Sequence, residues 1–202
     1  MSKPVNKMNN FQRIRELPKR QQSILSLLLL ERMKPNYQLF VQVTDFPQPY
    51  ELDNLMQNLW DRALVKGAKV NLGAMENKLE EMTPNEHEFD MYGVYPAIYF
   101  CTAMLTYIAG EASADELDPV AVAKISQGCI VHLIEYQAGE EELDNSAIRE
   151  HELMQAETEL LSSVIEWLET TKLGGKDAKQ IQQQALDVAF VEPVTNIGIE
   201  LG

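Results

Sequence analysis

The chain has few of the residues from which disulfide scaffolds and metal sites are built. Its 202 residues include two cysteines and three histidines. The cysteines, Cys101 and Cys129, both lie in apolar runs and are too few for the disulfide framework of a small secreted domain. A chain of this length buries about 70% of the surface that its unfolded form exposes, so it needs neither disulfides nor a structural metal to fold. We therefore expect two reduced core cysteines in a cytoplasmic protein.

Basic residues are also scarce. Lys and Arg number 17 against 31 Asp and Glu, and the formal net charge is −14. Nucleic-acid affinity comes mostly from Lys and Arg that release counterions, so this charge argues against a nucleic-acid partner. The charge is uneven, because residues 1–34 carry a net +6 and residues 35–202 a net −20. The exclusion therefore applies more firmly to the body of the protein than to its N-terminal segment.

One segment is long and apolar enough to deserve a membrane test. Met91–Gly110 has no charged residue over its 20 positions, which is about the length that spans a bilayer. It contains Pro96 and four tyrosines, and it is flanked by Asp90 and Glu111 instead of Lys or Arg. A helix that is apolar on all sides is also what the centre of a helical bundle requires. We expect a buried helix, and no membrane partner.

The common catalytic and metal-binding motifs are absent from the sequence. It has no G-x-S-x-G turn, no P-loop and no dinucleotide fingerprint. No histidine has a glutamate three residues before it, as di-iron bundles require. Cys129 and His132 lie one helical turn apart, but zinc needs two further ligands. We expect no cofactor and no metal; His151, which lies between two glutamates, is expected to be solvated.

Apolar residues recur at helical spacing through most of the chain. The clearest stripe is made of Leu52, Leu55, Met56, Leu59, Trp60, Ala63 and Leu64. Asp118 and Pro119 predict the start of a second clear helix, and Gly139 its end. Further helices are predicted over 19–34, 35–43, 72–82 with Asn71 as cap, after a Thr83–Glu86 capping box, over 146–171 and over 177–190.

These helices fill the chain with no Gly-rich, Ser-rich or Pro-rich linker between them. No convincing alternating strand is found outside the tail, residues 191–201. The sequence therefore predicts an all-α, single-domain bundle of about eight to ten helices with one central, very apolar helix. We expect residues 9–202 to form this domain and residues 1–8 to be mobile.

Four segments resemble the bacterial YjaG family in sequence, order and spacing. They are Glu31–Tyr37, Val65–Asn71, Phe89–Ile98 and Asn196–Ile199. The resemblance runs from about Phe11 to the C-terminus. It implies a bacterial, cytosolic helical protein, and because the family is a domain of unknown function it supplies no reaction, cofactor or catalytic residue. Its polar motif residues, whose roles are unknown, are Arg32, Asn36, Tyr37 and Asn196.

A cluster of polar residues near helix ends is the candidate ligand site. It consists of Lys69, Asn71, Asp90, Tyr92 and Tyr95. Polar groups at the mouth of an apolar bundle either line a pocket or cap helices and satisfy buried backbone groups. Both interpretations remain open for this cluster.

Two charged segments have similar alternatives. The acidic one is either a solvated face or a site for divalent cations or a basic partner; it holds Glu140, Glu141, Glu142, Asp144, Glu150, Glu152, Glu157 and Glu159. The basic one is either exposed or docked on an acidic surface of the same or a second subunit; it holds Arg13, Arg15, Lys19 and Arg20.

Three hypotheses of function follow. The leading one is a non-enzymatic interaction or regulatory protein that self-associates as a homo-oligomer or binds a protein partner, because the charge is polarised and no catalytic constellation is present. The second is a small-ligand binder or enzyme that uses the polar cluster. The third is divalent-cation binding by the acidic helix.

Overall fold

A computed structural model describes residues 8–47, 52–113, 117–175 and 177–201. Within these ranges the chain forms nine α-helices and one 3-10 turn, and its extended pairing is limited to an isolated bridge between Val194 and Glu200. The predicted all-α bundle of eight to ten helices is confirmed. Residues 1–7, for which mobility is predicted, lie outside the described residues. The helices are α1 Asn10–Glu16, α2 Lys19–Thr44, α3 Leu52–Leu64, α4 Leu72–Met82, α5 Val94–Ala112, α6 Pro119–Ala138, α7 Asn145–Glu150, α8 Glu152–Thr170 and α9 Ala178–Ala189.

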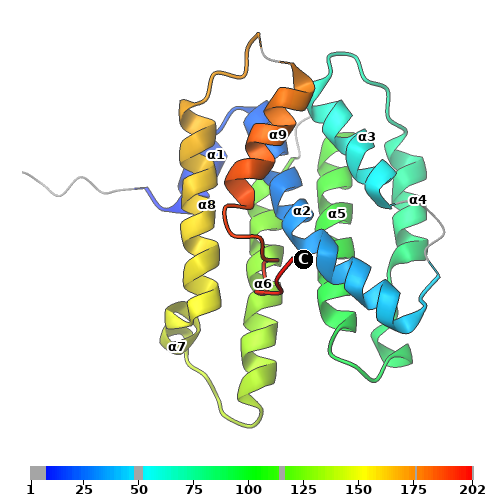
Figure 1. The fold of residues 1–202 in the computed structure, drawn as a ribbon, viewed down its shortest axis with the longest axis vertical. Helices are drawn as coiled ribbons and strands as arrows, with labels where there is room; N and C mark the ends of the chain where they lie inside the picture. The colour runs from blue at the N-terminus through cyan, green and yellow to red at the C-terminus, as the bar shows by residue number, and fades with distance from the viewer. Residues whose placement is uncertain (1–7, 48–51, 114–116, 176, 202) are drawn as a thin grey trace, which may run out of the picture.

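The apolar helix α5 lies at the centre of the bundle. It packs against α2, α4 and α6, and Figure 1 shows α6 and α8 on one side of it and α4 on the other. Phe100, Met104 and Tyr107 of α5 are fully buried, as the uncharged run predicts. Among the described residues, no helix is long and apolar enough to cross a membrane. The burial of α5 among α2, α4 and α6 confirms the predicted central, very apolar helix.

The caps predicted at three helix ends are present. Asn71 Oδ1 accepts a hydrogen bond from the N–H of Ala74, and Asp118 Oδ1 accepts from the first turn of α6. Gly139 ends α6 with a φ of 65°, a left-handed value that glycine adopts without a Cβ clash. The stripe on α3 is buried except for Ala63, which is half-buried. Local chemistry alone therefore determines these boundaries.

Helix α2 is one continuous helix, and the prediction of a break before Pro35 is wrong. Pro35 has no N–H to donate to the carbonyl of Glu31, so one bond of the helical ladder is missing. Met33, Tyr37 and Phe40 are nevertheless buried on both sides of the proline. The helix continues because the packing of this buried face outweighs one lost hydrogen bond.

The single helix predicted over residues 146–171 is also wrong, because His151 separates α7 from α8. The His151 backbone is extended, and its Nδ1 accepts a hydrogen bond from the N–H of Leu153 at 3.3 Å, so the imidazole is a half-buried cap and not a solvated group. Helix α8 buries Leu161, Val164 and Ile165, whereas no residue of α7 is buried. The apolar stripe therefore supports only the second helix.

The segment 83–86 does not form the predicted capping box. Thr83 ends α4 and its hydroxyl donates to the carbonyl of Leu79, while Asn85 caps a 3-10 turn, Glu86–Glu88. Helix α5 begins only at Val94. The intervening loop is held by Phe89, whose ring packs edge-on against Phe40 of α2 with the centroids 4.9 Å apart. This tertiary contact overrides the local helix-start signal.

Candidate functional site

The five residues of the predicted ligand cluster are not brought together. Lys69 and Asn71 precede α4, whereas Asp90, Tyr92 and Tyr95 follow its far end at the start of α5 (Figure 1). Asn71 caps α4, and with Lys69 it lines a hollow of about 200 Å³ between α3 and α4 that none of the other three reaches. Tyr92 and Tyr95 do meet, with ring centroids 5.9 Å apart. The cluster is therefore two separate places in the fold.

Tyr92 and Tyr95 belong to a group of aromatic rings between α5 and α6. The tyrosine cluster consists of Tyr92, Tyr95, Tyr99 and Tyr136 around His132. The Tyr95 and His132 rings lie 4.5 Å apart, the Tyr92 and Tyr136 rings 4.4 Å apart, and the Tyr92 hydroxyl is 3.3 Å from His132 Nδ1. Burial raises the pKa of Tyr92, so its phenol is neutral at physiological pH. The cluster thus offers aromatic faces, and Tyr136 is 60% exposed.

Tyr92 also lines an apolar groove. It has a volume of about 220 Å³ and is lined by Asn36, Leu39, Phe40 and Val43 of α2, by Met91, Tyr92, Gly93 and Pro96 at the start of α5, and by Ile197 and Ile199 of the tail. Leu39, Val43, Met91 and Ile199 are between 36% and 57% exposed. Two exposed carboxylate side chains, Asp90 and Glu200, each adjoin a lining residue in the chain. The groove is therefore apolar inside and has acidic neighbours.

Asn36 is one of the two polar side chains that line the groove, and it is almost completely buried. Its Nδ2 donates to Asn196 Oδ1 at 2.8 Å. Its Oδ1 is buried and has no hydrogen-bond partner among the described residues. Because the oxygen itself is buried, a group in the groove does not reach it.

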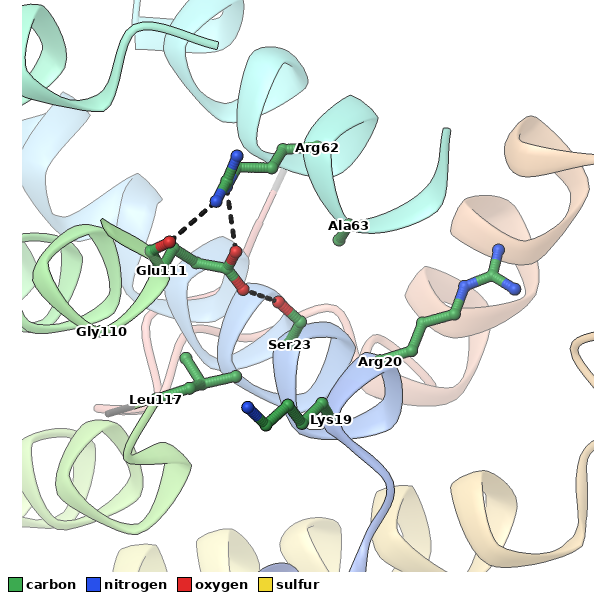
Figure 2. A pocket seen from close by; sticks show the side chains of 8 residues that line it. All are labelled: Lys19, Arg20, Ser23, Arg62, Ala63, Gly110, Glu111 and Leu117. Carbon is green, nitrogen blue, oxygen red and sulfur yellow. Dashed lines mark hydrogen bonds and ion pairs between the residues drawn. The ribbon is translucent and has the colours of Figure 1, made fainter. Parts of the chain in front are cut away.

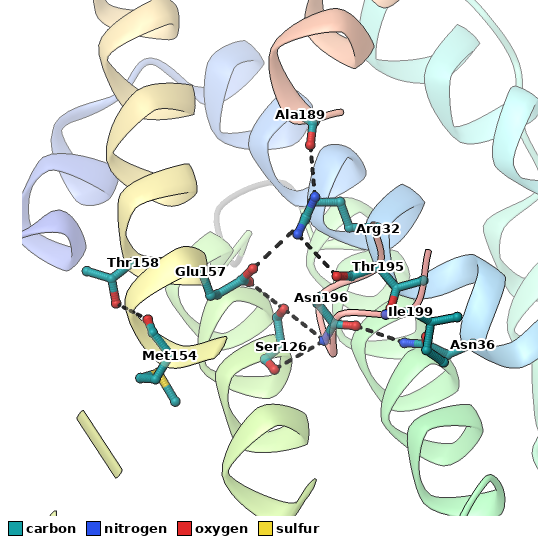
Figure 3. Close-up of polar contacts among 10 residues, drawn as sticks. All are labelled: Arg32, Asn36, Ser126, Met154, Glu157, Thr158, Ala189, Thr195, Asn196 and Ile199. Carbon is teal, nitrogen blue, oxygen red and sulfur yellow. Dashed lines mark hydrogen bonds and ion pairs between the residues drawn. The ribbon is translucent and has the colours of Figure 1, made fainter. Parts of the chain in front are cut away.

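A buried polar network fixes the tail that forms one wall of the groove (Figure 3). Arg32 donates to the carbonyls of Ala189 and Thr195 at 2.9 and 3.3 Å, and its Nε lies 3.9 Å from Glu157 Oε2. The Glu157 carboxylate accepts from the Ser126 hydroxyl at 2.7 Å. Asn196 Nδ2 lies 3.3 Å from both the carbonyl and the hydroxyl oxygen of Ser126. We call Arg32, Asn36, Ser126, Glu157 and Asn196 the tail network.

The tail network gives a structural role to three of the four family-motif residues. The fourth, Tyr37, donates its hydroxyl to the carbonyl of Met82 at 3.0 Å and so ties α2 to the end of α4. The sequence places Glu157 in the acidic segment, as part of a solvated face or of a cation or partner site, but its side chain is 2% exposed and the solvated alternative is wrong for this residue. Helical spacing indicates this burial, because Glu157 shares a face of α8 with the buried Leu161 and Val164. The partnership with Ser126 has no signal in a single sequence.

Burial also governs the ionisation of the tail network. The loss of water around Glu157 raises the pKa of its carboxyl group, against the smaller opposing effects of Arg32 and Ser126. The same loss lowers the pKa of Arg32. Because 3.9 Å is long for an ion pair, the guanidinium does not compensate for the lost hydration of the carboxylate. We therefore attribute the raised pKa of Glu157 to desolvation.

A polar pocket of about 240 Å³ lies between the start of α2 and the ends of α3 and α5 (Figure 2). The Glu111 carboxylate accepts hydrogen bonds from Arg62 Nε and from the Ser23 hydroxyl. Arg20 points away from this pair and donates to the carbonyl of Leu64. The pocket therefore carries its own anion, which occupies the donors that an anionic ligand would use.

Of the two alternatives for the basic N-terminal segment, docking on an acidic surface is observed at Arg13. Arg13 forms a two-point ion pair with Glu169 of α8, with distances of 3.0 and 2.7 Å. Arg15, Lys19 and Arg20 are exposed. Near Arg13, a wider hollow of about 860 Å³ lies between α1, α6 and α8, but the amides of Asn9 and Asn10 on its wall bind the backbone of their own chain. Gln127, Arg149, Gln155 and Glu159 also line this hollow.

Side chains that could bind a metal do not gather among the described residues, and both thiols are buried. In the part of the chain that the structure describes, no three His, Cys, Asp or Glu side chains lie close enough together to hold a metal ion. Cys101 and Cys129 are free and buried, and burial raises the pKa of each thiol to about 12. Both are therefore protonated at physiological pH and are poor nucleophiles.

Comparisons with known proteins agree with this fold. The chain is 35% identical over 133 residues to "Uncharacterized protein YjaG" of Escherichia coli (strain K12), a match that covers 65% of this chain and 67% of that protein. It is 28% identical over 202 residues to an "Uncharacterized protein" of Haemophilus influenzae, covering 99% and 98% of the two chains. The crystal structure of a DUF416 family protein from Shewanella baltica is similar, with a TM-score of 0.85 and 29% identity over 96% of this chain and 100% of that chain. The family described as "Protein of unknown function (DUF416)" matches residues 9–200, and the chain belongs to this family.

Proposed function

We propose that this protein is an interaction protein that binds an apolar segment of a partner protein in the apolar groove. One observation carries the proposal: four of the eight exposed large apolar side chains among the described residues meet in this one place. Scattered exposed apolar residues are normal on a protein surface, whereas apolar residues gathered in one place mark a binding site.

The size and lining of the groove favour a protein segment over a small metabolite. Its volume of about 220 Å³ is smaller than the roughly 300–1,000 Å³ of pockets for drug-sized ligands, and it suits one or two anchoring side chains. Asn36 and Tyr92 are the polar side chains in the lining, and they provide neither a nucleophile nor a charged group. This lining supports binding more than catalysis.

The walls of the groove are held in place before any partner binds. Arg32 donates to the carbonyl of Thr195, and Asn36 donates to the side chain of Asn196. These bonds fix the tail next to its two lining residues, Ile197 and Ile199. Phe89 fixes the loop before Met91 through its ring contact with Phe40. A preformed groove loses less conformational entropy on binding, so more of the contact energy remains as affinity.

A second copy of this chain is the alternative occupant, as the expected self-association implies. A symmetric dimer would place the same patch of both copies face to face. Asp90 and Glu200 would then face like charges across the contact. The charge therefore favours a different protein as the partner. Because both cysteines are free thiols, we propose that the two proteins meet in the reducing cytoplasm.

Selection from a library of random 12-residue peptides tests the proposal. We expect selected peptides to share one or two large apolar residues and to lose at least tenfold in affinity for Val43→Glu, measured by fluorescence anisotropy. Val65→Glu is the matched control, because Val65 is 43% exposed but lies outside the groove. Equal binding to both variants would refute the proposal. If light scattering gives the mass of a dimer, and Val43→Glu abolishes that dimer, the groove binds a second copy of this chain and not a different protein.

A further inference from the structure

We infer that the segment bound in the apolar groove is basic, with an arginine or lysine next to its apolar anchor. This inference rests on the proposed function and names the class of partner. It follows from two features around the groove: the sign of the neighbouring charges, and the aromatic wall that the groove shares with the tyrosine cluster.

The charged residues beside the groove are acidic. Asp90 precedes Met91, Glu200 follows Ile199, and Asp45 lies two residues after Val43; all three are exposed. One basic residue, Lys34, lies within two positions of a lining residue. Its ammonium group is already paired with Glu31 at 2.8 Å and with Asp53 at 3.2 Å. A cationic segment therefore meets complementary charge here, and an acidic segment meets repulsion.

Tyr92 joins the groove to a surface that suits a cation. This residue lines the groove, and its ring packs against His132 and Tyr136. The negative face of a tyrosine ring attracts ammonium and guanidinium groups, and a planar guanidinium also stacks on it. Glu135 is exposed next to Tyr136 in the chain. A basic side chain beside the apolar anchor can thus reach both aromatic and acidic groups.

Asn36 sets no polar requirement for the bound segment. Its Oδ1 has no partner among the described residues, but the atom is itself buried, so a donor seated in the groove does not reach it. The expected ligand is therefore a peptide with an apolar anchor and a flanking cation.

The same peptide library separates this inference from the proposed function. We expect Arg or Lys beside the apolar anchor in the selected peptides. At 20 mM salt, the double variant Asp90→Asn/Glu200→Gln should weaken such a peptide by about threefold to tenfold. The effect should disappear at 500 mM salt, and it should be absent for the same peptide with its basic residues changed to glutamine.

Glu80→Gln/Glu81→Gln on α4 is the matched control, since both residues are exposed and do not line the groove. If neutral or acidic peptides are selected, bind Val43→Glu weakly and ignore the Asp90→Asn/Glu200→Gln change, the groove binds a partner but the basic partner is refuted. If no selected peptide distinguishes Val43→Glu from Val65→Glu, the proposed function fails together with the inference.

Discussion

Glu157 is a carboxylic acid placed where a carboxylate is poorly accommodated. It is 2% exposed, one oxygen accepts from Ser126, and the other lies 3.9 Å from Arg32 without a hydrogen bond. A buried pair of this kind contributes little net stability relative to an apolar pair, but removal of one partner leaves an uncompensated group. The Ser126 hydroxyl that donates to Glu157 also accepts from Asn196 Nδ2, so Glu157 orients a group that binds the tail.

The raised pKa of Glu157 predicts a pH dependence of stability. The folded protein holds this proton at pH values where the unfolded chain, with the usual pKa of 4.5, has released it. The contribution of Glu157 to the free energy of unfolding therefore falls as pH rises from about 4.5 through the folded-state pKa, by at most about 1.4 kcal/mol per pH unit. Urea unfolding of the wild type and Glu157→Gln between pH 5 and 8 measures it.

We expect the stability of the wild type relative to Glu157→Gln to decrease across this range. Glu159→Gln, an exposed change two residues away on α8, should give a difference that is flat with pH. If the wild type instead gains stability over Glu157→Gln as pH rises, Arg32 holds the carboxylate ionised and desolvation is not the dominant effect.

At the scale of single elements, the helix ends that local chemistry controls could be predicted from the sequence. Asn71, Asp118 and Gly139 act through their own side chain or backbone within a few residues. At Pro35 and His151 the prediction was wrong, because packing against distant parts of the chain determines whether the helix continues. The tail is a third case, since its partners Arg32 and Ser126 lie 163 and 70 residues away from the residues they bind.

The turn that closes the tail depends on Gly198. Its φ is +80°, and a Cβ at this position would lie 2.9 Å from Cδ2 of Leu153. The left-handed conformation alone costs an L-residue about 1–2 kcal/mol, and Leu153 can relieve part of the clash because its methyl group is at the end of a flexible side chain. We predict that Gly198→Ala lowers the free energy of unfolding by about 1–2 kcal/mol, measured by chemical denaturation.

Gly174→Ala is the control for Gly198→Ala. Gly174 has no φ in the left-handed range, and a Cβ there meets nothing within 4 Å, so the free energy should change by less than about 0.5 kcal/mol. Because Ile197 and Ile199 line the groove, Gly198→Ala should also weaken the selected peptides. Full stability in Gly198→Ala would show that the turn is not under this constraint.

The whole molecule explains why the groove could not be found from the sequence. Its walls come from α2, from the start of α5 and from the tail, and no spacing rule relates residues 39, 91 and 199. Tyr92, which lies in the family segment Phe89–Ile98, is the one residue of the predicted cluster that lines the groove. Lys69 and Asn71 lie at the other end of α4. The sequence shows that all these residues are near helix ends, but it does not show at which end of the bundle each helix end lies.

Charge acts over the whole molecule, and its effect depends on whether each acidic residue has a partner. Glu142 is exposed in the loop that contains Glu140, Glu141 and Asp144, whereas Glu169 is paired with Arg13 at 2.7 Å. At 10 mM salt we predict that Glu142→Lys raises the thermal midpoint by about 1–2 °C and that Glu169→Lys lowers it by a similar amount.

Both shifts should shrink at 300 mM salt, because the Debye length is then less than about 10 Å and interactions between exposed charges are screened. The two variants change the net charge equally, so a response to net charge alone would move both midpoints upward by the same amount. If the two midpoint shifts have opposite signs and both approach zero as salt is added, local ion pairing determines the effect of each charge change. Scanning calorimetry at the two salt concentrations distinguishes these outcomes, and equal upward shifts would contradict the stabilising role assigned to the Arg13–Glu169 pair.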